Sequence, residues 1–116
     1  MFPKIHFHKT MTSFLLFGTI YLVLIVLFAV IYTAIDMSGA GTIKEHYLEE
    51  TNLSLPALLL RSLYFSLITI FAVGFGDITP FGLSRLFASI QAFIGFLMPI
   101  AIVIHLFPNE ERREGN

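Results

Sequence analysis

Two long stretches without Asp, Glu, Lys or Arg divide the chain, and they cover residues 10–35 and 86–109. At about 1.5 Å per residue, a helix over the first stretch is about 39 Å long, against about 30 Å for the hydrocarbon core of a bilayer. Each stretch therefore predicts a membrane-spanning helix, one over 10–35 and one over 84–107. The excess length of the first helix is taken up by tilt or by helix ends that lie at the membrane interface.

The first apolar stretch has one competing interpretation, a secretory signal peptide. Its length exceeds the roughly 7 to 15 apolar residues of such a signal, and no clear small-x-small cleavage site follows. The membrane-spanning interpretation is therefore preferred. Tyr32, near the end of this stretch, fits an interfacial aromatic belt.

The segment between the two stretches begins with a polar, glycine-bearing region, residues 36–55, which predicts a loop outside the hydrocarbon with a helical turn around 44–50. Asn52 lies in a glycosylation sequon, which matters only in a eukaryotic secretory route. An apolar segment over 56–71 follows, with Pro56 in its first turn and Ser54 placed to cap it.

The segment 56–71 is too short to cross a bilayer and predicts a re-entrant helix. A chain that dips into the membrane and returns is tolerated only where protein or a wet cavity surrounds it. The proline and glycine of residues 78–82 predict a turn before the second spanning helix.

The composition indicates the class of protein and excludes several classes of function. The chain is 56% hydrophobic and 13% charged, with a mean hydropathy of +0.82, which indicates an integral membrane protein. Without cysteine there is neither a disulfide framework nor a thiolate nucleophile. A net charge of −1 and the lack of a basic stripe argue against nucleic-acid binding. No nucleophile–base pair or metal-ligand cluster is visible, so we expect neither an enzyme nor a resident cofactor.

The most informative motif is Ala-Val-Gly-Phe-Gly-Asp at residues 72–77. Glycine adopts positive φ as easily as negative φ, so Gly74 and Gly76 let successive carbonyls turn to the same side. A ring of such ribbons can replace the water around a dehydrated cation. A chain of 116 residues cannot enclose a pore alone, so transport requires an oligomer.

This motif, with Tyr64 and Phe65 upstream and Asp77-x-Thr79-Pro80 downstream, resembles the selectivity filter of potassium channels. The resemblance to the two-helix pore module of that family covers nearly the whole chain. It implies an all-α membrane protein: a homotetramer of outer helix, re-entrant pore helix, extended filter and inner helix that conducts K⁺ passively. It also implies that backbone carbonyls hold the permeant K⁺ and that other residues support them.

The resemblance assigns these roles as follows: ion coordination to the carbonyls of Ala72, Val73, Gly74 and Phe75, and filter support to Thr69, Gly76, Asp77, Tyr64 and Phe65. Val73 and Phe75 point away from the pore, as alternation along an extended strand requires. Phe75 then packs against Tyr64 and Phe65. Asp77 either braces the filter mouth or is a solvated turn carboxylate. The helix end at 69–71 carries partial negative charge that favours a cation.

Three positions depart from the family pattern. Ala72 stands where threonine is usual, which removes a hydroxyl ligand and suggests a pore that also passes Na⁺. Phe75 replaces the commoner tyrosine, a familiar variant. Ile68 replaces an acid found in some members, so we expect Asp77 to find its partner in water, a backbone amide or a neighbouring chain.

In the second spanning helix, Pro99 lacks the amide hydrogen that would bond to the carbonyl of Gly95, which predicts a kink. By resemblance Gly95 matches a hinge glycine, so Gly95 and Pro99 form either a gating hinge or a fixed kink needed for packing. Phe96 and Val103 share a helical face and are candidates for lining the cavity. Phe107 is a candidate for narrowing its inner end, and His105 is a pH sensor or an interfacial residue.

The distribution of basic residues weakly favours both termini inside the cell. Four Lys or Arg lie in the two tails and three lie between the spanning helices. The resemblance supports the same topology, with the tail 108–116 cytoplasmic and the protein in the plasma membrane. The basic N-terminal segment 4–9 is expected to contact anionic lipid headgroups. A small, non-conducting membrane subunit is the alternative from another class.

Overall fold

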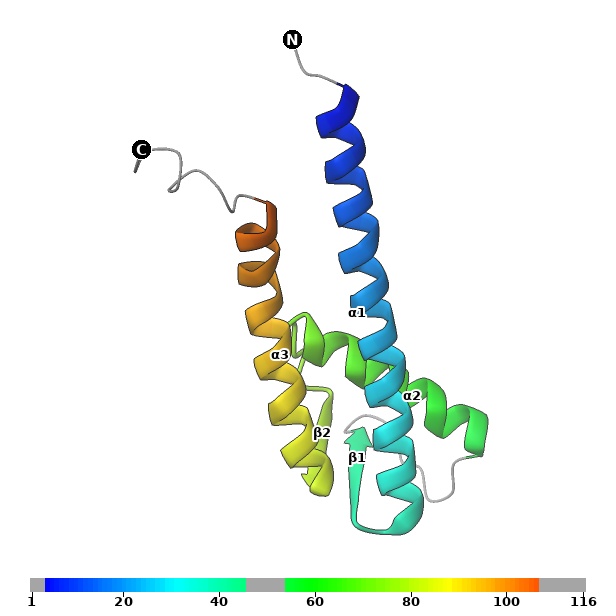
Figure 1. Cartoon of the computed structure of the whole chain (residues 1–116). Coiled ribbons are helices and arrows are strands. Elements are labelled where there is room, and N and C mark those ends of the chain that lie inside the picture. The colour runs from blue at the N-terminus through cyan, green and yellow to red at the C-terminus, as the bar shows by residue number, and fades with distance from the viewer. Residues whose placement is uncertain (1–3, 46–53, 107–116) are drawn as a thin grey trace.

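The computed structural model describes residues 4–45 and 54–106. Their elements in chain order are α1 (Lys4–Ser38), β1 (Gly41–Glu45), α2 (Leu55–Ile70), β2 (Ile78–Gly82) and α3 (Leu83–Leu106). The chain is mostly helical, with two long apolar helices and a short middle helix. Figure 1 shows that the first turn of α1 and the last turn of α3 lie at the same end of the molecule. The two strands lie at the opposite end, here called the strand end.

Helix α1 has 35 residues and extends beyond the expected range 10–35 at both ends. Hydrophobicity sets how much of a helix a bilayer can cover, whereas backbone hydrogen bonding sets where the helix stops. The charged residues at its start therefore limit the apolar span without ending the helix. It stops at Gly39, whose φ of +80° suits glycine and whose amide donates to the carbonyl of Asp36 at 3.2 Å.

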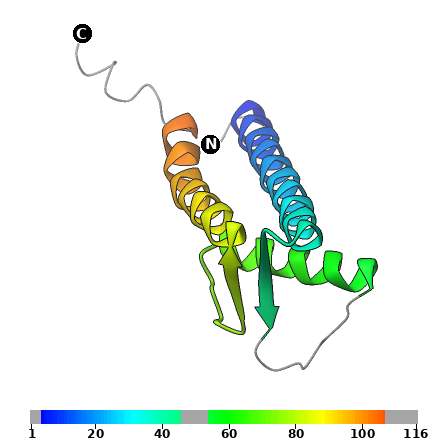
Figure 2. The ribbon, with the colours of Figure 1, turned by 90° about the horizontal axis from the view of Figure 1, so that it is seen from below.

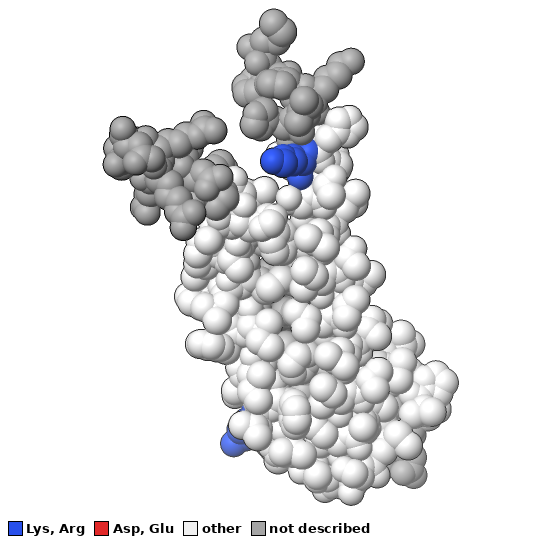
Figure 3. Space-filling model, in the orientation of Figure 1, with Lys and Arg blue, Asp and Glu red and all other residues white. Residues whose placement is uncertain are grey.

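Among the described residues, two helical segments are long and apolar enough to cross a membrane, His8–Ser38 and Leu83–Leu106. The face shown in Figure 3 carries a long band without coloured charged groups between a basic patch at one end and another near the strand end. Hydroxyl side chains in α1 do not interrupt this band, because they bond to their own helix. Thr12, Thr19 and Thr33 each donate to the carbonyl four residues earlier.

The strand end differs from the sequence prediction. Residues 78–82 were expected to form a turn, and this is wrong: they form β2, which pairs antiparallel with β1. Pro80 is tolerated because both strands of the sheet are edge strands within the described part of the chain, so a proline removes little of the ladder. Part of the expected loop 36–55 is therefore a strand. The helical turn expected at 44–50 is also wrong at Lys44 and Glu45, and its remainder lies outside the described residues.

Glycine makes the approach of β1 to α3 feasible. A Cβ on Gly41 would lie 2.8 Å from the amide nitrogen of Leu83 and 2.9 Å from that of Ser84. Its partner in the ladder, Gly82, has a φ of +64° and lies against the backbone at Ala40. The segment that follows α1 is thus fixed to the segment that leads into α3. Figure 2 shows the two strands side by side, with α2 crossing both α1 and α3.

The buried core lies toward the strand end, where all five elements meet. Its cluster consists of Phe28, Tyr32, Ile43, Phe65, Ile68, Ile78 and Ala88. Tyr32 was expected at the membrane interface, and this is wrong, because its side chain is fully buried in this cluster. Toward the other end, most apolar side chains of α1 and α3 are exposed, which leaves broad surfaces for lipid or for further copies of the chain.

Candidate functional site

Helix α2 begins as the sequence indicates, with proline in its first turn, but its cap is different. Ser54 occupies the N-cap position with extended backbone, φ −64° and ψ 157°, yet its side chain makes no capping hydrogen bond. The expected side-chain cap is therefore wrong. The Ser54 carbonyl accepts from the amide of Leu58 at 2.9 Å, as in any first turn. In Figure 1, α2 enters from the strand end and stops beside the middle of α3.

The chain reverses direction at the end of α2, held by backbone hydrogen bonds. The amide of Ala72 donates to the carbonyl of Thr69 at 3.2 Å. The amides of Val73 and Gly74 both donate to the carbonyl of Ile68, at 2.9 and 3.2 Å. These bonds satisfy carbonyls that a helix end otherwise leaves free, and they attach the segment 72–77 directly to the last turn of α2.

The sign of φ alternates along this segment. Ala72, Gly74 and Gly76 have φ of +58°, +50° and +84°, whereas Val73 and Phe75 are not in the positive-φ region. The positive φ expected of both glycines is present. Alternation of left- and right-handed backbone is the pattern that allows successive carbonyls to turn to the same side. Ala72 adopts this conformation without the freedom of glycine, at a strain of about 1–2 kcal/mol.

The side chains along this segment are exposed in the single chain, 51% for Val73 and 70% for Phe75. The expected packing of Phe75 against Tyr64 and Phe65 is therefore wrong within one chain. The reason is that Phe65 is turned into the core, with its ring edge-on to Tyr32 at a centroid distance of 5.1 Å.

Asp77 has a partner that the sequence analysis missed. The hydroxyl of Tyr64 donates to Asp77 Oδ2 at 3.0 Å, so the expectation that only water, a backbone amide or a neighbouring chain serves Asp77 is wrong. Loss of solvent, the bond itself and the charge of Asp77 raise the pKa of Tyr64 above its ordinary value of 10.0. The phenol therefore keeps its proton near neutral pH and remains a donor.

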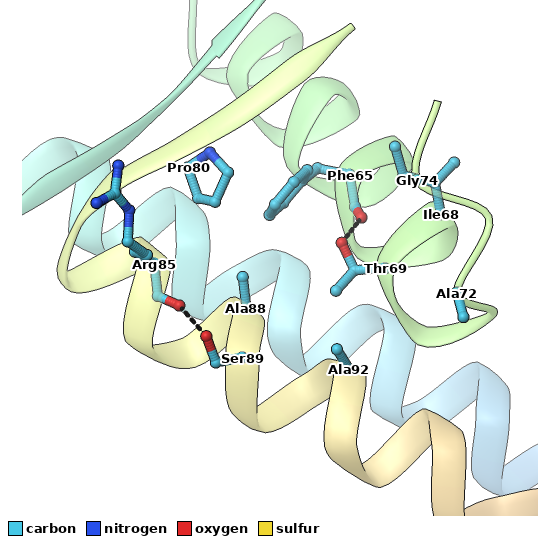
Figure 4. A pocket seen from close by; sticks show the side chains of 10 residues that line it. All are labelled: Phe65, Ile68, Thr69, Ala72, Gly74, Pro80, Arg85, Ala88, Ser89 and Ala92. Carbon is cyan, nitrogen blue, oxygen red and sulfur yellow. Dashed lines mark hydrogen bonds between the residues drawn. The ribbon is translucent and has the colours of Figure 1, made fainter. Parts of the chain in front are cut away.

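A hollow of about 350 Å³ opens between this segment and the neighbouring face of α3 (Figure 4). Its lining residues are Phe65, Ile68, Thr69, Ala72, Gly74, Pro80, Arg85, Ala88, Ser89 and Ala92. The Thr69 hydroxyl donates to the carbonyl of Phe65 at 2.6 Å, and the Ser89 hydroxyl donates to the carbonyl of Arg85 at 2.9 Å. Both hydroxyls are thus bonded within their own helices, and the wall is mostly apolar.

Gly95 is buried where α3 meets the end of α2. A Cβ at this position would overlap the carbonyl oxygen of Ile70 and lie 2.8 Å from its carbonyl carbon. Close packing alone therefore requires glycine here, whether or not the helix bends. Pro99 lies inside α3, which continues as one helix to Leu106.

The remaining candidates in α3 are exposed on its surface. Phe96 is 66% and Val103 is 57% exposed, so neither is buried against the rest of the chain, and their place in a cavity stays a prediction. His105 lies edge-on to Phe17 with ring centroids 5.4 Å apart. Phe107 lies outside the described residues.

Two polar networks among the described residues were not predicted from the sequence. At the strand end, Asp36 Oδ2 accepts from the hydroxyl of Thr42 at 2.6 Å and lies 3.6 Å from the guanidinium of Arg61. Deep in the core, Gln91 is hydrogen-bonded to both Tyr32 and Ser66. Gln91 is the single glutamine of the chain and lies within the second apolar stretch, which is a signal that could have identified it.

Within the part of the chain that the structure describes, no group of three His, Cys, Asp or Glu side chains is placed to hold a metal ion. The backbone carbonyls of residues 72–75, proposed from the sequence as ligands for a cation, carry no net charge and would depend on geometry alone.

The described residues form two apolar helices long enough to span a membrane, with a short helix and an extended return segment between them, an arrangement consistent with the pore module of a membrane channel. Comparison with known families agrees: the chain belongs to the ion channel family, whose sequence profile matches residues 10–107. The chain is therefore a channel-family protein and not an enzyme.

Two curated relatives are both described as Protein LctB. The one from Bacillus caldotenax is 38% identical over 85 residues, which cover 72% of this chain and 61% of the relative. The one from Geobacillus stearothermophilus is 40% identical over 57 residues, which cover 49% of this chain and 42% of the relative. The chain thus spans about three fifths and two fifths of the lengths of these relatives. No solved structure matches it.

Proposed function

We propose that four copies of this chain form a potassium-selective pore that conducts K⁺ passively down its gradient. The observation that carries the proposal is the alternating sign of φ at residues 72–76. A bare K⁺ needs a shell of oxygens to replace its water, and a ribbon that presents successive carbonyls on one side supplies one column of that shell. Four columns around an axis complete it.

The exposure of this segment supports an assembly rather than a lone chain. Backbone polar groups at membrane depth must be satisfied by protein, water or ions. Residues 72–76 are exposed, and the large apolar side chains of Phe75 and Phe96 are exposed as well. A symmetric ring would bury the apolar side chains between copies while it leaves the carbonyls facing a common axis.

The end of α2 adds a favourable field. Aligned peptide dipoles place partial negative charge at a helix C-terminus, which here is Ile70. Four such ends, directed toward one axis beside the middle of α3, would lower the cost of bringing a cation into the membrane.

The arrangement of α1 and α3 suggests the topology. The start of α1 and the end of α3 lie at one end of the molecule (Figure 1), which supports a topology with both on the same side of a membrane. The count of basic residues and the family resemblance favour the cytoplasmic side of the plasma membrane. The candidate coordinating residues remain Ala72, Val73, Gly74 and Phe75, and Asp77 with Tyr64 braces the filter mouth.

Ala72 favours a second candidate function, a pore with weak preference for K⁺ over Na⁺. Alanine keeps a carbonyl but has no hydroxyl to offer the innermost ion position. Ala72 also adopts positive φ, so the backbone there is strained as well as short of one ligand.

The test is ion flux into liposomes that contain the purified full chain. A K⁺ flux that barium blocks and that exceeds the Na⁺ flux supports the proposal, and native mass spectrometry should detect four copies. A reversal potential that does not change when K⁺ replaces Na⁺ favours the weakly selective pore. No flux of either ion, with the protein folded, would overturn the proposal and favour the non-conducting subunit.

A further inference from the structure

A closed chain of buried hydrogen bonds joins the three helices. The hydroxyl of Tyr32 in α1 donates to Gln91 Oε1 in α3 at 2.6 Å. Gln91 Nε2 donates to the hydroxyl oxygen of Ser66 in α2 at 2.6 Å and to its carbonyl oxygen at 3.1 Å. The Ser66 hydroxyl donates to the carbonyl of Ile25 at 2.8 Å, which returns the chain of bonds to α1.

The side-chain polar atoms of this cluster all form hydrogen bonds. Both amide hydrogens of Gln91 are donated, its oxygen accepts, and the Ser66 hydroxyl accepts one bond and donates another. Tyr32, Ser66 and Gln91 all have 0% exposed surface. Because these groups lie away from bulk solvent, each bond constrains the distance between two helices more strictly than a bond at the surface would.

The cluster lies next to the attachment of the filter segment. Ser66 is one turn from Ile70, the last residue of α2, and the carbonyls of Ile68 and Thr69 between them hold the amides of residues 72–74. One turn beyond Gln91, Gly95 lies directly against the carbonyl of Ile70. Helix α3 therefore contacts the last two turns of α2 at two points, one polar and one made by backbone contact.

We propose that Tyr32, Gln91 and Ser66 form a positioning cluster that fixes the end of α2 and, through it, the backbone of residues 72–74. The cluster touches neither ion nor filter, and acts through the carbonyls of Ile68 and Thr69. An effect of this cluster on ion selection rests on the proposed function. An effect of the cluster on the backbone of residues 72–74 does not depend on that function.

The test is hydrogen exchange of the backbone amides of residues 72–74 in the full chain, measured by mass spectrometry. Tyr32→Phe and Ser66→Ala each remove one hydroxyl from the cluster and keep the remaining packing. Side-chain hydrogen bonds in membrane proteins contribute about 0.6 kcal/mol on average and about 1.7 kcal/mol at most. At about 1.4 kcal/mol per factor of ten, we expect exchange at these amides to be roughly three to fifteen times faster in both variants.

Matched controls are available on the same helices. Tyr21→Phe removes a hydroxyl from a ring that stacks on Phe71, 5.1 Å away and directly before the filter segment, and it keeps the stack. Ser89→Ala removes a hydroxyl that bonds only to its own helix. Both controls should exchange as the wild type does at residues 72–74.

The exchange measurement separates a positioning role from simple stabilisation. If Tyr32→Phe and Ser66→Ala lower the melting temperature but leave exchange at residues 72–74 at the wild-type rate, the cluster only braces the fold and the proposal is overturned. Should Ser66→Ala fail to fold, Tyr32→Phe, which keeps the ring, decides the result alone.

Ion flux then distinguishes this proposal from the proposed function. A conducting protein should show a higher Na⁺-to-K⁺ permeability ratio in Tyr32→Phe than in Tyr21→Phe. If the wild type conducts no ions while faster exchange persists in the variants, the proposed function fails and the positioning role stands. If the wild type conducts and neither exchange nor permeability ratio changes, the positioning role fails.

Discussion

Gly76→Ala is the sharpest test of the filter assignment. Gly76 has a φ of +84°, and a Cβ added there would meet no atom within 4 Å in the single chain. The substitution therefore acts through backbone strain alone, about 1–2 kcal/mol per chain. In the proposed tetramer the four copies together carry roughly 4–8 kcal/mol, which reduces the population of the intact ring by about a thousandfold or more, at about 1.4 kcal/mol per factor of ten. The strain is relieved when the peptide before residue 76 rotates, and this turns the carbonyl of Phe75 away from the axis.

The assay is K⁺ flux in liposomes, with two control variants that separate strain from location. Gly39→Ala introduces a comparable positive-φ strain, at φ +80°, and also has no atom within 4 Å, but it lies at the end of α1. Gly18→Ala has equal space and no positive φ. We expect flux to be lost in Gly76→Ala and kept in both controls. Undiminished, selective flux in Gly76→Ala would refute the reasoning, as would equal loss in Gly39→Ala.

Three further substitutions test neighbouring parts of the site. Gly95→Ala should lower the melting temperature, because overpacking against Ile70 costs about 1–3 kcal/mol. If glycine were needed there only for bending, the substitution would instead raise stability, because alanine has the higher helix propensity. Tyr64→Phe, which removes the donor to Asp77, should reduce steady K⁺ flux without a matching loss of thermal stability, and unchanged flux would show that this bond does not hold the filter mouth. Ala72→Thr should lower the Na⁺-to-K⁺ permeability ratio measured from reversal potentials, and an unchanged ratio would show that the absent hydroxyl does not limit selectivity.

The sequence predicted the helices well because each depends on local features. Apolar length identifies the spans, and Pro56 with a short apolar run identifies α2. The prediction at residues 78–82 failed because proline and glycine favour turns locally, while strand formation there depends on pairing with residues 41–45, more than thirty positions away in the chain. Local signals carry no information on such a partner.

The polar contacts around the filter were missed for the same reason. The bonds within the Tyr32, Ser66 and Gln91 cluster join residues that are 25 to 59 positions apart. The sequence prediction considered residue 68 as the position of a partner for Asp77. The actual partner, Tyr64, lies one turn earlier on the same helix, α2. Sequence identifies which side chains can bond, and the crossing of α2 against α1 and α3 decides which ones do.

Where α3 can bend follows from the same contacts. On the side of α3 nearer the strand end, Gln91 is bonded to α2, and Gly95 lies against Ile70 with no room for a side chain. Movement at Gly95 would have to displace the end of α2 and the filter with it. Beyond Gly95, residues 96–106 are mostly exposed, and Pro99 leaves the carbonyl of Gly95 without its usual helical donor. We therefore expect α3 to bend at Pro99 during gating. Gly95 would stay in place against α2 while the part of α3 beyond Pro99 moves.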